Sequence, residues 1–160
     1  MENFKRLSEN LDSIRNVFFH HTIVGDTCSK NNQIIGIGST AYVDNNKSCT
    51  NEFSEPQSNH EYLSFIEMQT LDGFGFDSNQ SYFLKIDTEG FEKNVLLGAQ
   101  KFIRDSHPTI AAAVYHKADD IFDIMNFILG IRNDYSVYLE HYTQGFMETI
   151  MFFVPSNSKS

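Results

Sequence analysis

The second half of the chain alternates between segments typical of buried strands and segments typical of helices, and this alternation constrains the fold more than any other feature. Strands are predicted at residues 81–87, 109–116, 135–142 and 146–154. Apolar residues at helical spacing predict helices over 91–103 and 121–131, which separate the first three strands. Parallel strands need crossover connections, whereas a short turn forces an antiparallel pair. We therefore expect an α/β fold with a doubly wound, mostly parallel sheet and an antiparallel C-terminal strand at its edge.

The first half of the chain is less regular. Apolar residues at spacings of three and four predict an N-terminal helix: Phe4, Leu7, Leu11 and Ile14. Aromatic and β-branched residues predict a strand over 17–24, which ends at Gly25-Asp26, and a further strand over 62–71. Between them the chain is rich in Asn, Ser, Gln and Thr. We expect residues 27–60 to be an inserted polar loop with one hairpin.

The composition excludes several classes of protein. The 160 residues include 12 Lys+Arg and 21 Asp+Glu, a net charge of -9, which argues against a nucleic-acid-binding protein because such proteins need a cationic surface. No apolar run reaches the roughly 18–20 residues of a membrane span, and the N-terminus lacks the apolar core of a signal peptide. We therefore expect one cytoplasmic domain over residues 1–160, with no membrane and no nucleic-acid partner.

One glycine-rich segment fits a nucleotide-binding pattern only in part. Residues 36–41 (GIGSTA) match G-x-G-x-x-G/A, a pattern that works because the glycines let a helix N-terminus approach a pyrophosphate. Residues 42–46 have no helical spacing of apolar residues. We interpret the segment as part of a hairpin and not as a nucleotide site.

The strongest candidate site is an acidic run directly after a predicted strand. Asp87 ends the strand at 81–87, and Glu89 and Glu92 open the helix that follows. His116 ends the next strand and should face the same crevice, because ligands of open α/β sheets bind beyond the carboxyl ends of the strands. For Glu92 we prefer a role in helix capping and surface charge. Asp87 and Glu89 are candidate functional carboxylates, and His116 has an alternative interpretation as a partly exposed strand-end histidine.

Other potentially reactive residues give weaker patterns. Asp87, Glu89 and His116 are able to converge on a divalent cation, but the sequence has no close ligand spacing, and we assign no metal site. His20 and His21 are adjacent on a predicted strand and point to opposite faces. Cysteines occur at two positions in polar loop, Cys28 and Cys49. His141 is interpreted as a packing residue.

Residues 84–92 (LKIDTEGFE), followed by 95–99 (VLLGA), resemble the signature of the FkbM-type methyltransferases. Other segments are similar to the family in the same order. They are residues 3–10 after its second strand, 24–26 at the end of its third strand, 69–72 before its fourth strand, and 115–117 with the closing strands near its C-terminus. The resemblance covers nearly the whole chain and implies a Rossmann-like class I methyltransferase fold.

The resemblance also implies a reaction and its residues. Members of the family use S-adenosylmethionine, which implies O-methylation of a hydroxyl on a sugar, a glycan or another small molecule. Asp87 then lies nearest the methyl group, as a cofactor-binding and catalytic residue, and Asp26 contacts the adenine part of the cofactor. Glu89 orients the acceptor or assists, and His116 is a second candidate base.

The chain departs from the family at its start. Its first residue falls after the family's first two strands and Gly-rich cofactor loop, which implies an N-terminally truncated domain. In the family's strand order, 3-2-1-4-5-7-6, this leaves the strand at 17–24 without neighbours and exposes the backbone edge of the strand at 81–87. The alternative is a non-catalytic remnant or interaction module, whose exposed edge is covered in an oligomer or by a partner chain. A fragment of an interrupted gene is a third interpretation.

Overall fold

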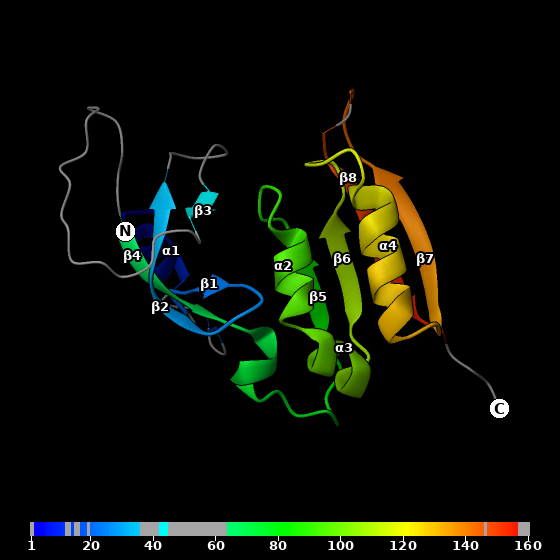
Figure 1. Cartoon of the computed structure of the whole chain (residues 1–160), viewed down its shortest axis with the longest axis horizontal. Coiled ribbons are helices and arrows are strands. Elements are labelled where there is room, and N and C mark those ends of the chain that lie inside the picture. Colours follow the sequence, from blue (N-terminus) through cyan, green and yellow to red (C-terminus); the bar gives the residue numbers. More distant parts are fainter. Residues whose placement is uncertain are drawn as a thin grey trace.

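The structure is a computed structural model, and it describes residues 2–11, 14, 17–18, 20–35, 42–44, 64–145 and 147–156. Two four-stranded sheets lie next to each other, with α2 (Glu92–Leu97) and α4 (Asp120–Ile131) in front of the second one (Figure 1). None of the helices in these residues is long and apolar enough to cross a membrane.

The second sheet is built from the strands predicted in the second half of the chain. Its order is β5-β6-β8-β7, formed by β5 (Phe83–Ile86), β6 (Thr109–Ala113), β8 (Thr149–Pro155) and β7 (Tyr135–His141). The first two strands are parallel, and β8 is antiparallel to both β6 and β7. The antiparallel C-terminal strand is thus confirmed, although the prediction that it forms an edge is wrong.

The position of β8 follows from its composition. Four apolar residues of β8 pair with β6, and Ile110 of β6 lies opposite Phe153, both fully buried. The edge strand β7 carries exposed residues over its second half. The more apolar strand therefore takes the interior position, where both of its neighbours cover it.

Helices cover one face of this sheet in the described residues, which corrects the doubly wound expectation. The main core contains Ile86, Leu96, Ile103, Ile124, Ile128 and Phe153. These residues come from the sheet and from α2, α3 (Gln100–Ser106) and α4. The opposite face has a small cluster of Ala111, Ala113 and Ile150.

The helix predicted over 91–103 is divided into α2 and α3 at Gly98. A Cβ at position 98 would collide with the carbonyl oxygen of Gly25, so only glycine permits this approach of the two backbones. The carbonyl of Gly98 also accepts a hydrogen bond from the amide of Asp72 at 2.9 Å. The Asp72 carboxylate in turn accepts from the amides of Lys101 and Phe102 at 3.1 and 2.8 Å, which caps the start of α3.

The first sheet has the order β1-β4-β2-β3, and α1 (Glu2–Leu11) precedes it. Its strands are β1 (Ile23–Val24), β2 (Ser29–Ile35), β3 (Tyr42–Asp44) and β4 (Ser64–Gln69), and the short helix η2 (Leu71–Phe74) follows. Among its described residues, the strand predicted over 17–24 is thus limited to the two residues of β1. The expectation that it has no neighbour is wrong, because β1 pairs in parallel with β4.

The hairpin predicted within residues 27–60 is present as the antiparallel pair β2 and β3, with Ile34 opposite Val43. Because β2 also pairs with β4, it belongs to a sheet and is more than a loop. The GIGSTA segment at 36–41 lies between the paired strands but outside the described residues, as does Cys49.

At the other end of the second sheet, β5 pairs with β6 alone among the described strands. Within the described residues the other side of this strand thus has no strand neighbour, as expected, and Phe83 at its start is 64% exposed.

Candidate functional site

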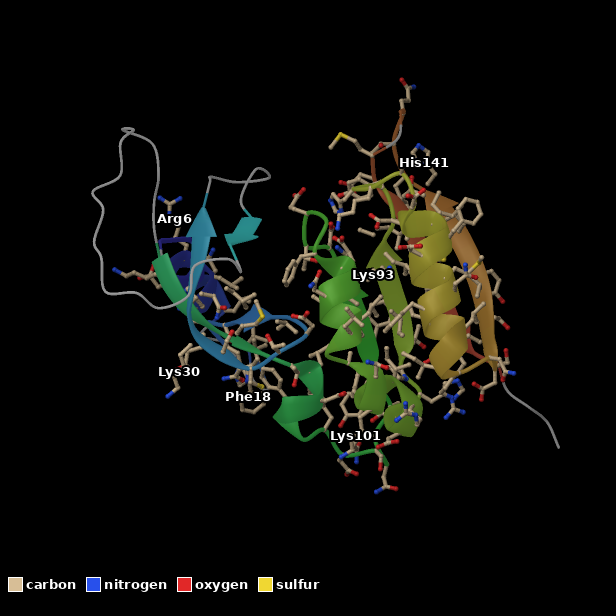
Figure 2. All side chains as sticks on the ribbon, in the orientation of Figure 1. Arg6, Phe18, Lys30, Lys93, Lys101 and His141 are labelled. Atoms are coloured by element: carbon tan, nitrogen blue, oxygen red, sulfur yellow. The ribbon has the colours of Figure 1, made fainter. Side chains whose placement is uncertain are left out.

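The candidate site lies where the parallel strands β5 and β6 end. Asp87 and Glu89 follow β5, and His116 follows β6 after two more residues. His141 marks the same end of the sheet in Figure 2, and Lys101 marks the opposite end. The prediction that the acidic run and His116 meet beyond the strand ends is confirmed by three pairs of atoms at ion-pair distance.

Glu92 organises the loop that carries the acidic residues. Its side chain is 1% exposed, and its Oε1 accepts hydrogen bonds from the amide of Thr88 at 2.7 Å, the hydroxyl of Thr88 at 3.2 Å and the amide of Gly90 at 3.3 Å. The expected capping role is thus close to what is seen, whereas the expected surface charge is wrong. The loop turns through positive φ angles of 52° at Glu89 and 93° at Gly90, and the second of these favours glycine.

His116 lies between three carboxylates, and its side chain is 9% exposed. Its Nδ1 is 2.9 Å from Oε1 of Glu92, and its Nε2 is 3.2 Å from Oε2 of Glu89 and 3.9 Å from Oδ1 of Asp87. The geometry of these contacts does not meet the angular requirements of a hydrogen bond. Both ring nitrogens of His116 are therefore buried without a hydrogen bond, as is Oε2 of Glu92. Buried polar atoms without a hydrogen bond are rare in native structures and call for an explanation.

Asp87 is held by two neighbours. Its Oδ2 accepts from the Lys85 ammonium at 2.8 Å, and its Oδ1 accepts from the Tyr115 hydroxyl at 3.3 Å. Burial and the nearby Asp87 carboxylate raise the pKa of Tyr115 to about 12. The phenol is therefore protonated at neutral pH and remains a donor to Asp87.

The segment between β6 and α4 is fastened to the loop after β5. The Lys117 ammonium donates to the carbonyl of Gly90, and the Lys117 amide donates to Asp120 at 2.8 Å. Asp120 is 5% exposed, and burial raises the pKa of its carboxyl group, although the hydrogen bond from Lys117 acts in the opposite direction. These contacts hold the two strand ends in a fixed relation.

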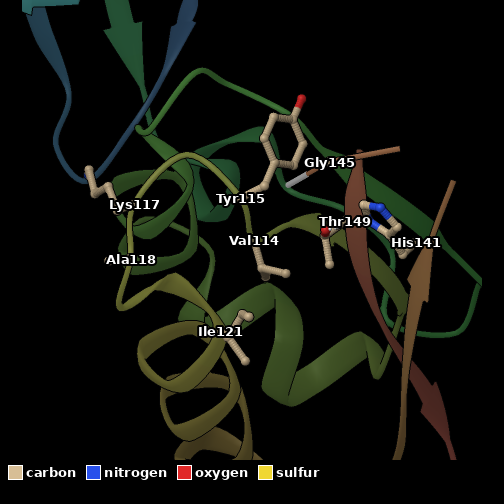
Figure 3. Close-up of a pocket in the computed structure, with 8 residues that line it drawn as sticks. All are labelled: Val114, Tyr115, Lys117, Ala118, Ile121, His141, Gly145 and Thr149. Atoms are coloured by element: carbon tan, nitrogen blue, oxygen red, sulfur yellow. Dashed lines mark hydrogen bonds between the residues drawn. The ribbon is translucent and has the colours of Figure 1, made fainter. Parts of the chain in front are cut away.

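An open pocket of about 490 Å³ adjoins the cluster (Figure 3). Its lining comes from the end of β6, the start of α4 and the β7–β8 turn: Val114, Tyr115, Lys117, Ala118, Ile121, His141, Gly145 and Thr149. Tyr115 and Lys117 also contact the acidic loop, so they belong to both the pocket and the cluster. His141 is exposed and its Nδ1 is 2.9 Å from the Thr149 hydroxyl, which corrects its interpretation as a packing residue.

Asp26 lies apart from this cluster. Its Oδ2 accepts a hydrogen bond from the side-chain amide of Asn94, on α2, at 3.4 Å. The described contacts of Asp87 and His116 do not include Asp26. The structure thus joins Asp87, Glu89 and His116, whereas the hydrogen bond of Asp26 is to Asn94 on α2.

Metal-ligating side chains converge at one place within the part of the chain that the structure describes. Asp87, Glu92 and His116 each offer one ligand atom, and these atoms lie within 4.8 Å of one another. The set considered from the sequence contained Glu89 where the structure has Glu92. Cys28 is exposed, and its Sγ is 3.9 Å from the Thr70 hydroxyl.

Sequence reasoning undervalued Glu92, although a signal for it exists. Glu92, Val95 and Leu96 are spaced three and four positions apart, so they share one helix face, and all three are buried. A glutamate on the apolar face of the first helical turn is therefore directed at the strand end and not at solvent.

The fold and this cluster define an α/β protein with mixed sheets and a polar site at the carboxyl ends of its parallel strands. The family model described as methyltransferase FkbM domain matches residues 7–146. The chain belongs to this family. No curated protein matches the chain.

A solved structure has the same fold. It is that of methyltransferase FkbM from Methylobacillus flagellatus KT, with a TM-score of 0.66 and 21% sequence identity. The alignment covers 95% of this chain and 33% of the other one. The chain thus spans about a third of the length of the protein whose fold it shares.

Proposed function

We propose that this chain is an S-adenosylmethionine-dependent methyltransferase domain that methylates a hydroxyl group of a sugar, a glycan or another small molecule. The observation that carries the proposal is the convergence of Asp87, Glu89 and His116 beside the open pocket, in a chain of the FkbM family. In open α/β sheets, ligands are expected to bind at this position, beyond the carboxyl ends of the strands.

The cluster fits a positively charged methyl donor. Three carboxylates, those of Asp87, Glu89 and Glu92, surround His116, and of these Asp87 forms an ion pair with Lys85. This excess of negative charge favours a sulfonium, which supplies the methyl group. Asp26 contacts α2 through Asn94, so its proposed contact with the adenine part requires the cofactor to extend along that helix.

The residues of the cluster divide the work on the acceptor. As the new C–O bond forms and the C–S bond breaks, the hydroxyl proton must pass to a base. Each oxygen of Asp87 already accepts one hydrogen bond, from Lys85 or Tyr115, and its remaining lone pairs are assigned to orienting the hydroxyl. Glu89 is 45% exposed and has free lone pairs, so we assign the proton to Glu89. Asp87 and His116 orient the hydroxyl, and the products are a methyl ether and the demethylated cofactor.

Isothermal titration of the folded chain with S-adenosylmethionine, followed by transfer of its labelled methyl group to a panel of sugars and small alcohols, tests the proposal. We expect binding, and we expect Glu89→Gln to lower methyl transfer by about 100-fold, as loss of a general base does. Asp134→Asn, the matched change at the other end of the sheet, should not alter it. A folded chain that neither binds the cofactor nor transfers methyl groups would contradict the proposal.

A second candidate function is a non-catalytic interaction module. The side of β5 that has no strand neighbour among the described residues and the exposed Phe83 favour it, because unpaired edges recruit further strands. Light scattering over a range of concentrations separates the two functions. A stable monomer at every concentration would count against a required partner.

A further inference from the structure

We infer that Asp87, Glu92 and His116 bind a divalent transition-metal ion such as Mn²⁺, through two carboxylate oxygens and one imidazole nitrogen. This goes beyond methyl transfer as proposed above, which requires no metal. The starting observation is that one ligand atom from each residue lies within 4.8 Å of the other two. Ligands at bond lengths of about 2.0–2.3 Å around one ion are separated by distances of this size.

The second observation is independent of that spacing. The Glu92 side chain is 1% exposed and the His116 side chain 9% exposed, and Oε2 of Glu92 and both ring nitrogens of His116 are buried without a hydrogen bond. Burial of a carboxylate with a free oxygen is costly unless a cation or a donor satisfies it. An ion bound by Oε2 of Glu92 and one ring nitrogen of His116 supplies a partner for each of those two atoms.

The protein organises these ligands in advance. Glu92 uses Oε1 for the Thr88 and Gly90 donors, which leaves Oε2 as the oxygen available to an ion. Asp87 is held by Lys85 and Tyr115, each of which uses one lone pair of a different oxygen, and a carboxylate has further lone pairs. In metalloproteins generally, neighbouring groups hold the ligating side chains in place by hydrogen bonds of this kind.

The ligand set selects the class of ion. An imidazole nitrogen is a poor ligand for Mg²⁺ and Ca²⁺, which prefer oxygen, and it suits first-row transition metals. Carboxylates in turn suit Mn²⁺. Three protein ligands leave coordination positions free, and the pocket bordered by Tyr115 and Lys117 adjoins the site. An acceptor hydroxyl bound there loses its proton more readily, and Glu89, outside the ligand set, remains available to take it up.

Electron paramagnetic resonance of Mn²⁺ added to the full chain, with no cofactor present, tests the inference directly. We expect one Mn²⁺ per chain and displacement by Zn²⁺ but not by an equal concentration of Mg²⁺. Loss of a group that only orients a metal ligand costs about 10- to 100-fold in affinity, so Asp87→Asn and His116→Gln should each weaken binding by at least about 100-fold. The matched control Asp134→Asn should bind as the unchanged chain does.

The outcomes decide the inference separately from methyl transfer. A folded chain that binds no Mn²⁺ overturns it, and His116 is then an internal ion-pair partner of Glu92 and Glu89. Binding that is unchanged in Asp87→Asn or His116→Gln also overturns it, as does displacement by equal Mg²⁺. Circular dichroism establishes that each variant is folded. Because no cofactor is used, failure of the proposed methyltransferase leaves this result unaffected.

Discussion

Two histidine–carboxylate pairs occupy the opposite ends of β6, and they differ in their charge balance. His116 follows the strand, and its Nε2 is 3.2 Å from Glu89. His107 precedes the strand, and its Nε2 is 3.3 Å from Asp134. The two carboxylates are 45% and 40% exposed. By the distance between their atoms and by the exposure of their carboxylates, the pairs are nearly equivalent.

Their surroundings separate them. Asp134 accepts two hydrogen bonds from the Arg132 guanidinium, one at 2.9 Å from Nε, and these hydrogen bonds lower the pKa of the Asp134 carboxyl group. Glu89 instead shares His116 with the carboxylates of Asp87 and Glu92. A carboxylate with its own cation stabilises the fold, whereas several carboxylates around one imidazole do so poorly. The comparison indicates that the His107–Asp134 pair is structural and the His116–Glu89 pair functional.

The largest loss of stability is expected on substitution of Glu92, a residue with both a functional and a structural role. Glu92 belongs to the functional cluster but also holds the loop from Thr88 to Gly90. Glu92→Ala leaves two amides without an acceptor and should lower the free energy of unfolding by about 3 kcal/mol. Urea denaturation measures it, with Glu140→Ala on exposed β7 as the control, expected within about 0.5 kcal/mol. A loss below about 1 kcal/mol for Glu92→Ala would show that the buried carboxylate does not organise the loop.

Smaller losses of stability are expected when the tyrosine at either end of the sheet is replaced by phenylalanine. The Tyr135 hydroxyl donates to the carbonyl of Pro108 at 2.9 Å in a buried position, and burial raises the pKa of this phenol. Tyr135→Phe should lower the free energy of unfolding by about 1 kcal/mol. Tyr115→Phe, whose hydroxyl contacts Asp87 from a half-buried position, should change it by less than about 0.5 kcal/mol. Equal losses in thermal or urea unfolding would remove the distinction between the two ends.

The smallest effect expected is a pH dependence at the amino end of β6. Burial and the Arg132 charge lower the pKa of His107 from 6.5, so the folded state binds the proton less readily than the unfolded state. The stability that neutral His107 contributes is therefore complete above pH 6.5 and is lost as the pH falls through the lowered pKa. Urea denaturation at pH 7, 6 and 5 should show a smaller decline in the free energy of unfolding for His107→Asn than for the unchanged chain. Asparagine is chosen because it tolerates the positive φ of 46° at this position. An unchanged decline would assign the acid sensitivity to other groups.

The sequence predicts the framework of the site well, because local rules determine it. Strand patterns at 81–87 and 109–116 place Asp87 and His116 at neighbouring strand ends, and the structure brings them together. The rule that ligands bind beyond strand carboxyl ends needs no knowledge of the loops. Chain position relative to the strands was sufficient for these residues.

Features that depend on distant partners were not predictable in the same way. The break at Gly98 exists because the Gly25 backbone approaches it, and no local pattern reveals a neighbour 73 positions away. The strand expected over 17–24 has high β-propensity, but among its described residues the strand pairing is limited to Ile23 and Val24, with β4.

The most direct test of the contrast between the two ends is the difference in unfolding free energy between Glu89→Gln and Asp134→Asn. Both substitutions replace a half-exposed carboxylate by an amide of the same shape, opposite a histidine. We predict that Asp134→Asn costs about 1 kcal/mol, since Arg132 loses its charged partner. Glu89→Gln should cost less than about 0.5 kcal/mol or increase stability, since it removes one of three neighbouring negative charges. Equal losses at the two positions would contradict the assignment of the carboxyl-end cluster to function.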